Sequence, residues 1–380
     1  MRIEKVEAYP VRVPIKPLTE GGVAPYRGSR EAMGTSWVTG VIYKLTTEEG
    51  LVGWGEMNLI YSLDITMCII KEMLVPALVG AEIFHRNAIK DSLRSIYNPD
   101  INTLHLVSGV EMALWDLEGK ALGCPISRLL GGKVRDRIPA AYAFGYLDEI
   151  ETKNKVKEVC DEGFRTIKTK GGISLEEDIR RAFWLREAAG EGMEIRVDMN
   201  QAYRMDQAVR YMKAVEPCGL QYVEQPFRVR MLSEYRQIRG RCGTPIAINE
   251  DTYIPGGIWE ALRCGAADAA VVDMESLGGI GELQKAAYLA EAAGVSLAHH
   301  CAWDMGVKTA AVLQATSALP AFQLAMDTTY MSHGADILSA PLVISEGSYL
   351  VPEGPGLGVE VNEEALEEYR CSDRRLRFVF

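Results

Sequence analysis

The sequence lacks the marks of several protein classes. Its eight cysteines are scattered along the chain without any C-x-x-C pair, so we expect reduced, mostly buried thiols rather than a disulfide framework. No run of about 18 apolar residues is present that could cross a membrane. The first residues alternate in charge and contain no apolar signal-peptide core. These absences predict a cytoplasmic protein.

Positive charge is also in short supply. The chain has 41 Lys and Arg residues against 52 Asp and Glu residues, which gives a net charge of −11 at pH 7. Such an acidic balance argues against nucleic acid and against anionic membranes as partners. If the substrate is a small anion, the site must supply its own positive charge, and a bound cation together with lysines would do so.

The length and composition favour two domains. The chain has 380 residues, of which 48% are apolar and 24% charged, so a large barrel beside a smaller domain is expected. Residues 3–13, 37–46 and 51–57 are rich in the Val, Ile, Tyr and Thr that are typical of strands. Residues 65–122 are helical in pattern. We therefore predict an N-terminal α+β domain, residues 1–125, that caps the barrel.

Beyond about Ile138, short apolar runs alternate strictly with amphipathic helical stretches. Eight such units predict a (β/α)8, TIM-like barrel over residues 126–330, because short apolar runs suit parallel strands buried on both faces. A doubly wound open sheet is disfavoured by the count of eight and by the absence of a G-x-G-x-x-G turn after the first strand. The tail, residues 331–380, returns to turn-rich strand patterns and is expected to rejoin the capping domain. The eight runs are 138–144, 164–168, 193–198, 220–224, 245–249, 268–273, 295–299 and 322–327.

Acidic residues end three successive runs of the predicted barrel. Asp198, Glu224 and Glu250 follow one another at intervals of 26 residues, about one βα unit, so they are expected on one rim. Three converging carboxylates repel one another unless a cation binds between them. Oxygen ligands without paired His or Cys favour Mg²⁺. The alternative is three unrelated rim carboxylates, solvated or paired with lysines.

Two lysines end the second run. Lys168 and Lys170 are two positions apart, so their side chains point to the same face of a strand. Near a metal, two ammonium groups lower each other's proton affinity, and such a lysine can act as a base near neutral pH. We expect Lys168 to bind the substrate carboxylate and Lys170 to be a base. Asn200, on the neighbouring rim, is a further candidate for substrate contact. The alternative is a solvated pair of lysines.

An aspartate and a histidine end two further runs. Asp273 and His300 are 27 residues apart, and Asp327 follows His300 by the same interval. A carboxylate that holds an imidazole fixes its tautomer and raises its basicity. Because His299 and His300 alternate faces, only one can point inward, and we choose His300. A protonated Asp327 could donate a hydrogen bond to the substrate, although a role as a helix cap is an alternative.

Several longer motifs run through the chain: VGWGE at 52–56, SGVEMALWDLEGKALGCP at 108–125, LLGG at 129–132, K-T-K at 168–170, VDMN at 197–200 and VEQP at 223–226. Together they resemble the mandelate racemase and muconate-lactonizing branch of the enolase superfamily over essentially the whole chain. The Asp273–His300 pair resembles that of the mandelate-racemase-like group. Three departures are visible: no lysine stands near Ser276, Asp327 stands where many relatives carry Glu, and Asn249 precedes Glu250 where some relatives place a ligand.

The resemblance implies a Mg²⁺ site, an enolate intermediate and bases on either side of a carboxylate substrate. The leading hypothesis is a lyase that dehydrates a hydroxy acid, such as an acid sugar, to a 2-keto acid. A racemase or epimerase of an α-hydroxy or proline-type acid is the second. The missing lysine near Ser276 weighs against cycloisomerase chemistry. A non-catalytic binding barrel would be expected to lose some of these positions, and all are present.

Substrate specificity is expected in the loops that cap the barrel mouth. Arg27 and Tyr61, with Arg30 and Asn58, could contact substrate hydroxyls or a distal carboxylate, and exposed loop residues without a ligand are the alternative. A homo-oligomer is what the family resemblance implies.

Overall fold

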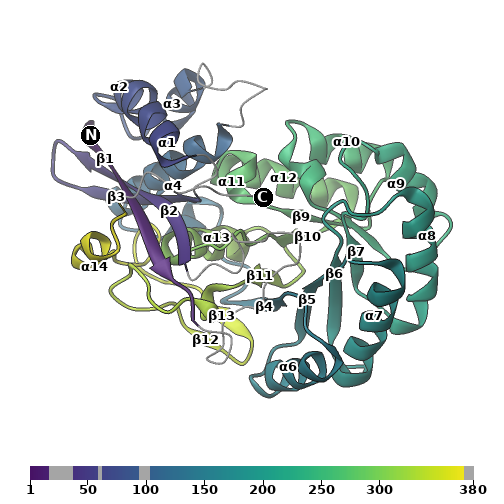
Figure 1. Cartoon of the computed structure of the whole chain (residues 1–380). Helices are drawn as coiled ribbons and strands as arrows, with labels where there is room; N and C mark the ends of the chain where they lie inside the picture. Colours follow the sequence, from purple (N-terminus) through teal and green to yellow (C-terminus); the bar gives the residue numbers. More distant parts are fainter. Residues whose placement is uncertain (17–36, 59–61, 94–102, 372–380) are drawn as a thin grey trace.

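The computed structural model describes residues 1–16, 37–58, 62–93 and 103–371. Its N-terminal part is an antiparallel sheet of β1 (Ile3–Pro14), β2 (Trp37–Thr47) and β3 (Val52–Asn58), drawn in purple in Figure 1. Helix α4 (Leu104–Ala121) packs on this sheet at very short range. A Cβ atom added to Gly55 would lie 1.9 Å from the carbonyl oxygen of Gly109, so glycine is required there for the contact.

The helical pattern predicted for residues 65–122 is divided into several pieces. They are α1 (Leu63–Ile69), the π-helical turn η2 (Ile70–Leu74), α2 (Val75–Leu78), α3 (Arg86–Leu93) and α4. The chain leaves α2 through Gly80, whose φ of +81° suits glycine. Below the sheet, these helices and the strands share a buried apolar cluster that includes Val41, Leu74 and Val110.

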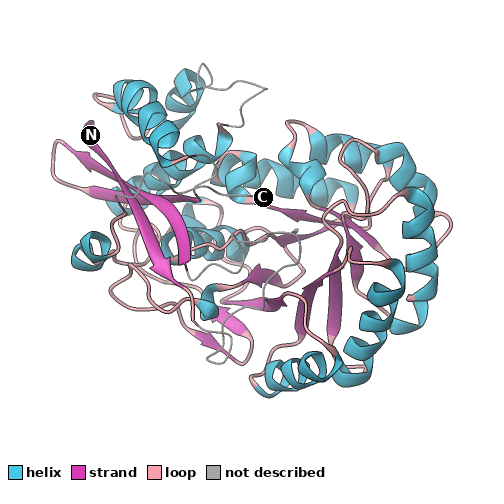
Figure 2. Ribbon diagram, viewed as in Figure 1, coloured by secondary structure: helices cyan, strands magenta, loops and turns pink. Residues whose placement is uncertain are grey.

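The rest of the chain forms the predicted barrel, and each of the eight apolar runs contains a strand. Neighbouring strands from β4 to β10 are parallel, β11 pairs with β4, and backbone hydrogen bonds from Leu297 N to Ala321 O and from Leu324 N to Leu297 O join β10 to the segment before β11. Figure 2 shows the helices on the outside of these strands. The strands are β4 (Arg137–Phe144), β5 (Thr166–Lys170), β6 (Glu194–Asp198), β7 (Tyr222–Glu224), β8 (Ile246–Ile248), β9 (Ala269–Val272), β10 (Ser296–His299) and β11 (Met326–Thr328).

The barrel helices follow their strands closely. Helix α7 spans Leu175–Ala189, and Ser174 caps its first turn by accepting the N–H of Glu177. The others are α5 (Ile126–Leu129), α6 (Glu149–Asp161), α8 (Met205–Ala214), α9 (Leu232–Arg239), α10 (Gly257–Cys264), α11 (Met274–Leu277), α12 (Ile280–Ala293) and α13 (Gly306–Ala318), with the 3₁₀ turns η4 (Glu216–Cys218), η5 (Glu250–Tyr253) and η6 (Tyr330–Ser332).

The C-terminal tail contacts both parts of the molecule. Its hairpin of β12 (Ile344–Ser345) and β13 (Ser348–Leu350) adds antiparallel to the start of β4. Helix α14 (Glu363–Glu368) then brings the chain to the capping sheet, where Arg12 N–H donates to the carbonyl of Tyr369 and Cys371 N–H donates to that of Pro10. The tail thus ties β1 to the barrel.

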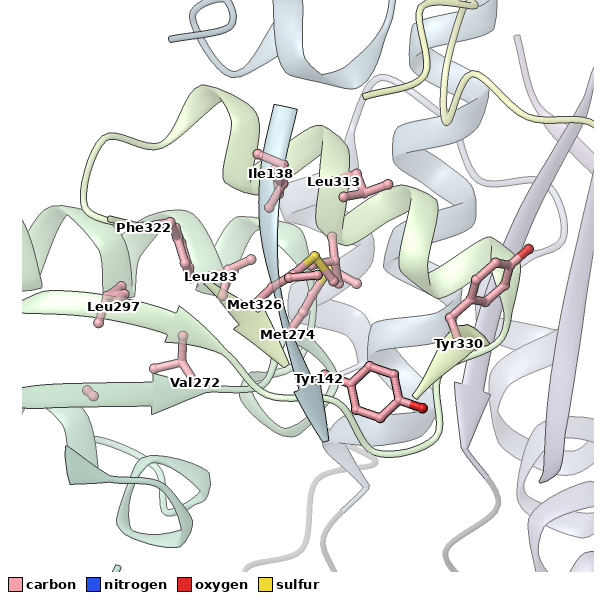
Figure 3. Close-up of a cluster of buried hydrophobic side chains, with 14 of the residues drawn as sticks. Ile138, Tyr142, Val272, Met274, Leu283, Leu297, Leu313, Phe322, Met326 and Tyr330 are labelled. Atoms are coloured by element: carbon pink, nitrogen blue, oxygen red, sulfur yellow. The ribbon is translucent and has the colours of Figure 1, made fainter. Parts of the chain in front are cut away.

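The main apolar core lies where the barrel meets α12 and α13 (Figure 3). Leu297 and Val272 reach it from β10 and β9, Met326 from β11, and Leu283 and Leu313 from the two helices. Every residue of α13 is buried, because this helix lies between the capping sheet and the barrel. All eight cysteines are free thiols. The prediction that most of them are buried is wrong, because only Cys124, Cys218 and Cys371 are buried, four are partly buried and Cys68 is exposed. Among the described residues, no helix combines the length and the apolar character needed to cross a membrane.

Candidate active site

Strand register brings the predicted rim residues to one level. Lys170 on β5 aligns with Asp198 on β6, and Asp198 aligns with Glu224 on β7. Aligned residues of neighbouring parallel strands point to the same side of the sheet, so the three side chains meet at the carboxyl ends of the strands. Lys168 lies two residues below Lys170 on the same face of β5.

Five charged residues at this level, with Asp327 from β11 as the fifth, form what we call the rim cluster. The Lys168 ammonium group donates to Glu224 at 2.8 Å and to Asp327 at 2.7 Å, and Lys170 donates to Asp198 at 2.7 Å and to Asn200 Oδ1 at 2.6 Å. Lys168, Asp198, Glu224 and Asp327 are buried, whereas Lys170 is half-buried and Asn200 is exposed. The structure therefore collects charged groups from β5, β6, β7 and β11. The rim cluster is Lys168, Lys170, Asp198, Glu224 and Asp327.

Burial, mutual repulsion and the two lysines set the pKa values of the carboxylates in the rim cluster. Burial, and then the charge of Asp198, raise the pKa of Glu224 to about 8, although Lys168 opposes the shift. Burial also acts to raise the pKa of Asp198, but Lys170 and Lys168 outweigh it and hold that pKa below its ordinary value. Within one cluster, therefore, one carboxylate keeps its charge at the expense of its neighbour.

Two expectations about protonation need correction in the structure as it stands. Burial disfavours the charged form of Lys168, but Asp327, Glu224 and Asp198 outweigh burial and raise its pKa well above its ordinary value. Asp327 likewise has its pKa lowered, against burial, by Lys168 and Arg196. Lys168 is thus an ammonium and Asp327 a carboxylate that accepts hydrogen bonds, because each neutralises the other.

Glu250 lies slightly beyond the rim cluster. Glu224 aligns with Ala247 on β8, so Glu250 comes three residues later, as the first residue of η5. Its Oε1 accepts from Asn200 Nδ2 at 3.3 Å and from Gln201 Nε2 at 3.2 Å, whereas its buried Oε2 has no hydrogen-bond partner among the described residues. Burial and the charge of Asp198 raise its pKa.

The fit of this site to a metal ion can be judged from its donors. As the side chains stand in the described part of the chain, no three or more His, Cys, Asp or Glu residues are grouped closely enough to hold one, because the two lysines act as counterions instead. The donors nevertheless suit a hard cation: they are all oxygens. Glu250 has an oxygen without a partner, and Asp198 repels both glutamates. Asp198, Glu224 and Glu250 therefore suit Mg²⁺ by the chemistry of their donor atoms, but not by their present spacing.

The predicted dyad is in contact. His300 Nδ1 lies 3.1 Å from Asp273 Oδ2, so the carboxylate accepts from Nδ1 and leaves Nε2 available. His299 is buried, and its Nε2 accepts the N–H of Met274 at 3.0 Å. Burial lowers the pKa of His299 to about 4, so this imidazole is neutral and structural. The adjacent positions of the two histidines therefore have different surroundings, as the alternation of a strand requires.

Of the residues predicted to set substrate specificity, only Asn58 lies in the described part of the chain. Arg27, Arg30 and Tyr61 lie outside the described residues. Asn58, at the end of β3, is buried; its N–H donates to Glu275 at 2.7 Å and its Nδ2 to Asp304 at 3.3 Å. Asn58 thus joins the capping sheet to the barrel.

Several buried charged residues escaped the sequence analysis. Arg196 is fully buried below Asp198 and donates to Asp327 at 3.2 Å. Lys308, on α13, is fully buried beside Asp273. A signal was present for Lys308, which is the single charged residue between Asp304 and Asp327, but not for Arg196, which stands between Glu194 and Asp198. A charge in such a setting requires a buried partner.

The fold and the rim together define a barrel enzyme of the enolase type with a capping domain. Family models agree: residues 18–131 match the mandelate racemase / muconate lactonizing enzyme N-terminal domain, and residues 151–365 match the enolase C-terminal domain-like family. The chain therefore belongs to the mandelate racemase and muconate-lactonizing branch of the enolase superfamily.

Individual relatives carry different activities in their names. The chain is 34% identical over 286 residues to D-galactarolactone cycloisomerase of Agrobacterium fabrum. This alignment covers 71% of this chain and 75% of the relative. It is 29% identical to arabinonate dehydratase of Saccharolobus solfataricus, over 87% of this chain and 90% of the relative. The muconate lactonizing enzyme of Pseudomonas fluorescens, solved with muconolactone, has a TM-score of 0.87 at 28% identity and covers 97% of this chain and 99% of its own. Other matches are named racemases and epimerases.

Proposed function

We propose that this protein uses Mg²⁺ to remove the α-proton of a carboxylate substrate, and that the net reaction is the dehydration of a hydroxy acid or acid sugar to a 2-keto acid. The observation that carries the proposal is the placement of two bases around the carboxylates. Lys170 on β5 and His300 after β10 are separated by β4 and β11 on one side of the ring and by β6 to β9 on the other. A substrate at the barrel mouth would have one base on each side.

In this proposal, Asp198, Glu224 and Glu250 hold the metal ion. Bound Mg²⁺ would polarise the substrate carboxylate and offset the negative charge that develops as the α-proton leaves. A cation among these carboxylates would also compete with the two lysines for them. Lys170 would then be released from Asp198, to which it now donates. Lys168 would keep Asp327 as a partner and bind the substrate carboxylate.

The protein groups carry the proton transfers. Lys170, as a neutral amine, takes the α-proton on its Nζ while the α-carbon's C–H bond breaks. His300, held by Asp273, gives a proton to the β-hydroxyl, which leaves as water when the C–O bond breaks. The enol that remains tautomerises to the 2-keto acid. Asn200 stays a predicted substrate contact, and the homo-oligomer also stays a prediction.

A racemase or epimerase is the second candidate, because the same two bases serve it. One base would take the α-proton and the other would return a proton on the opposite face, with no bond to oxygen broken. The arrangement around β5 and β10 supports both reactions, so only the products separate them.

Incubation in D₂O with a panel of acid sugars, α-hydroxy acids, proline-type acids and sugar lactones tests the proposal. We expect Mg²⁺-dependent formation of a keto acid that reacts with semicarbazide. Deuterated substrate with its hydroxyls intact would support an epimerase instead. An isomerised lactone would point to the activity in the name of the Agrobacterium relative. No exchange and no product with any of these acids would contradict the proposed function.

A further inference from the structure

Lys308 is a fully buried charged residue at the junction of the capping domain and the barrel. It is the single charged side chain of α13, and it has no exposed surface. Its Nζ lies 2.8 Å from Glu275 and 2.8 Å from Asp304. It also lies 3.3 and 3.4 Å from the two carboxylate oxygens of Asp273. We call Lys308, Asp273, Glu275 and Asp304 the lysine cluster.

The lysine cluster holds the aspartate of the dyad from several sides. Asp273 caps α11: its Oδ1 accepts the N–H groups of Glu275 at 2.7 Å and of Ser276 at 3.2 Å. Its Oδ2 faces His300 at 3.1 Å. Lys308 reaches both oxygens, so the carboxylate has little freedom to turn away from the imidazole.

We propose that Lys308 is a positioning residue for the His300–Asp273 dyad: its ammonium group fixes the orientation of Asp273 and offsets part of the negative charge that the imidazole experiences. This inference deepens the proposed function and rests on it for the role of His300 in catalysis. Lys308 itself is buried and does not reach the substrate. Without it, Asp273 would stabilise the protonated imidazole more strongly, and His300 would give up its proton less readily.

The titratable groups around Lys308 come from four elements. Asp273, the N-cap of α11, and Glu275 within α11 flank it, and the others are Asp304 in the turn before α13, Glu56 on β3 and the two histidines at the end of β10. The carboxylates outweigh burial and raise the pKa of Lys308 well above its ordinary value. A permanent positive charge beside Asp273 follows from this setting.

Capping-domain contacts fix both the backbone and the partners of Lys308. Glu56 accepts the N–H of Met305 at 2.7 Å and the N–H of Lys308 at 2.8 Å, so it caps α13. Glu275 accepts the N–H of Asn58 at 2.7 Å and lies 2.9 Å from His105 Nδ1 on α4. The docking of β3 and α4 on the barrel therefore helps to set the geometry of the dyad.

The test uses the full-length protein and a variant that removes one charge of each sign. Lys308→Met combined with Glu275→Gln keeps the net charge of the buried cluster and removes the ammonium next to Asp273. Lys308→Arg keeps the positive charge and is the conservative control. The chain has five histidines, so the imidazole of His300 can be assigned by NMR with a His300→Asn variant.

We expect the titration midpoint of His300 to rise by about one pH unit in the double variant and to move by less than half of that in Lys308→Arg. The pH dependence of kcat should shift in the same direction, with KM changed little, because Lys308 does not touch substrate. If the double variant does not fold, Glu275→Gln alone leaves Lys308 with one carboxylate fewer and should lower the midpoint.

The outcomes separate this inference from the proposed function. A folded double variant whose midpoint is no higher than that of Glu275→Gln would overturn the role of Lys308, because these two proteins differ only at residue 308. An unchanged midpoint in Glu275→Gln would also overturn it. A shifted midpoint in a protein that exchanges no α-proton of any acid would leave the positioning role intact and reject the proposed function. A loss of stability with no shift of the midpoint would make Lys308 a purely structural residue and would also overturn the inference.

Discussion

The molecule has two clusters of buried charge, and they differ in what holds them. In the rim cluster, the ion pairs connect strand ends of the barrel, and Lys170 retains partial access to solvent, as does Glu250 just beyond the cluster. In the lysine cluster, one ammonium group serves three carboxylates and is enclosed by the capping sheet. Under the proposed function, the rim cluster would exchange its lysines for a cation and a substrate, whereas the enclosed lysine cluster would keep its partners. The two clusters thus differ in their access to solvent and in the elements that surround them.

Replacement of Lys170 by Ala should have the largest effect. The rim cluster would lose its base, and proton abstraction should fall by about 10²- to 10⁴-fold, with the change in stability smaller than that for Lys308. Deuterium incorporation into substrate measures the rate. Lys285→Ala, at an exposed lysine paired with Glu282 on α12, is the matched control and should retain wild-type activity. Exchange at the wild-type rate in Lys170→Ala would remove this lysine from the mechanism.

Replacement of Lys308 alone by Met should mainly affect stability. Three carboxylates would remain buried without their cation, and breaking a buried ion pair in this way costs about 3–5 kcal/mol. Urea unfolding followed by circular dichroism gives the free energy, and Lys285→Met serves as the control. The comparison between the two clusters would fail if Lys170→Ala destabilised the fold as much as Lys308→Met.

Metal binding should stabilise the protein through the rim alone. A ligand that binds only the folded state adds about 2.7 kcal/mol at 100 times its Kd. We therefore expect Mg²⁺ to raise the unfolding free energy, EDTA to reverse the effect, and Glu224→Gln to weaken it. Calorimetry of Mg²⁺ binding is an independent readout. Equal stabilisation of Glu224→Gln and wild type would place the ion elsewhere.

A third prediction on stability concerns a histidine outside both clusters. His333 is buried, neither ring nitrogen has a hydrogen-bond partner among the described residues, and burial lowers its pKa to about 4. The unfolded chain binds this proton more readily, so the contribution of His333 to stability is present above pH 6.5 and is lost as the pH falls towards 4. The loss is about 3 kcal/mol.

The variant His333→Phe should remove that part of the pH dependence. Relative to wild type, its unfolding free energy should rise as the pH is lowered from 7 to 4, as measured by urea titrations at several pH values. His299, which stays in both proteins, gives the remaining acid sensitivity. Parallel pH profiles for the two proteins would contradict the prediction.

The barrel could be predicted because its pattern is local and repeated. Each short apolar run needs only neighbouring residues to specify a buried strand, and all eight runs contain one. The regular spacing of that repeat also predicted that Asp198, Glu224 and His300 stand at strand ends. Lys308 did not follow, because its partners come from α11 and from its own turn, and the cap that encloses it comes from β3. The charge states of Lys168 and Asp327 were also missed, since each depends on a partner more than 150 residues away.

Glu56 has a consequence for any attempt to recombine this protein with its relatives. The same carboxylate that ends a cap strand also completes the first turn of a barrel helix, by accepting two of its N–H groups. A chimera with its cap from one parent and its barrel from another would lose the acceptor for these N–H groups, unless Glu56 and Asn58 came from the same parent as the barrel. The crossover point for such a hybrid therefore belongs before β3, and the two parts of the chain are not independent building blocks.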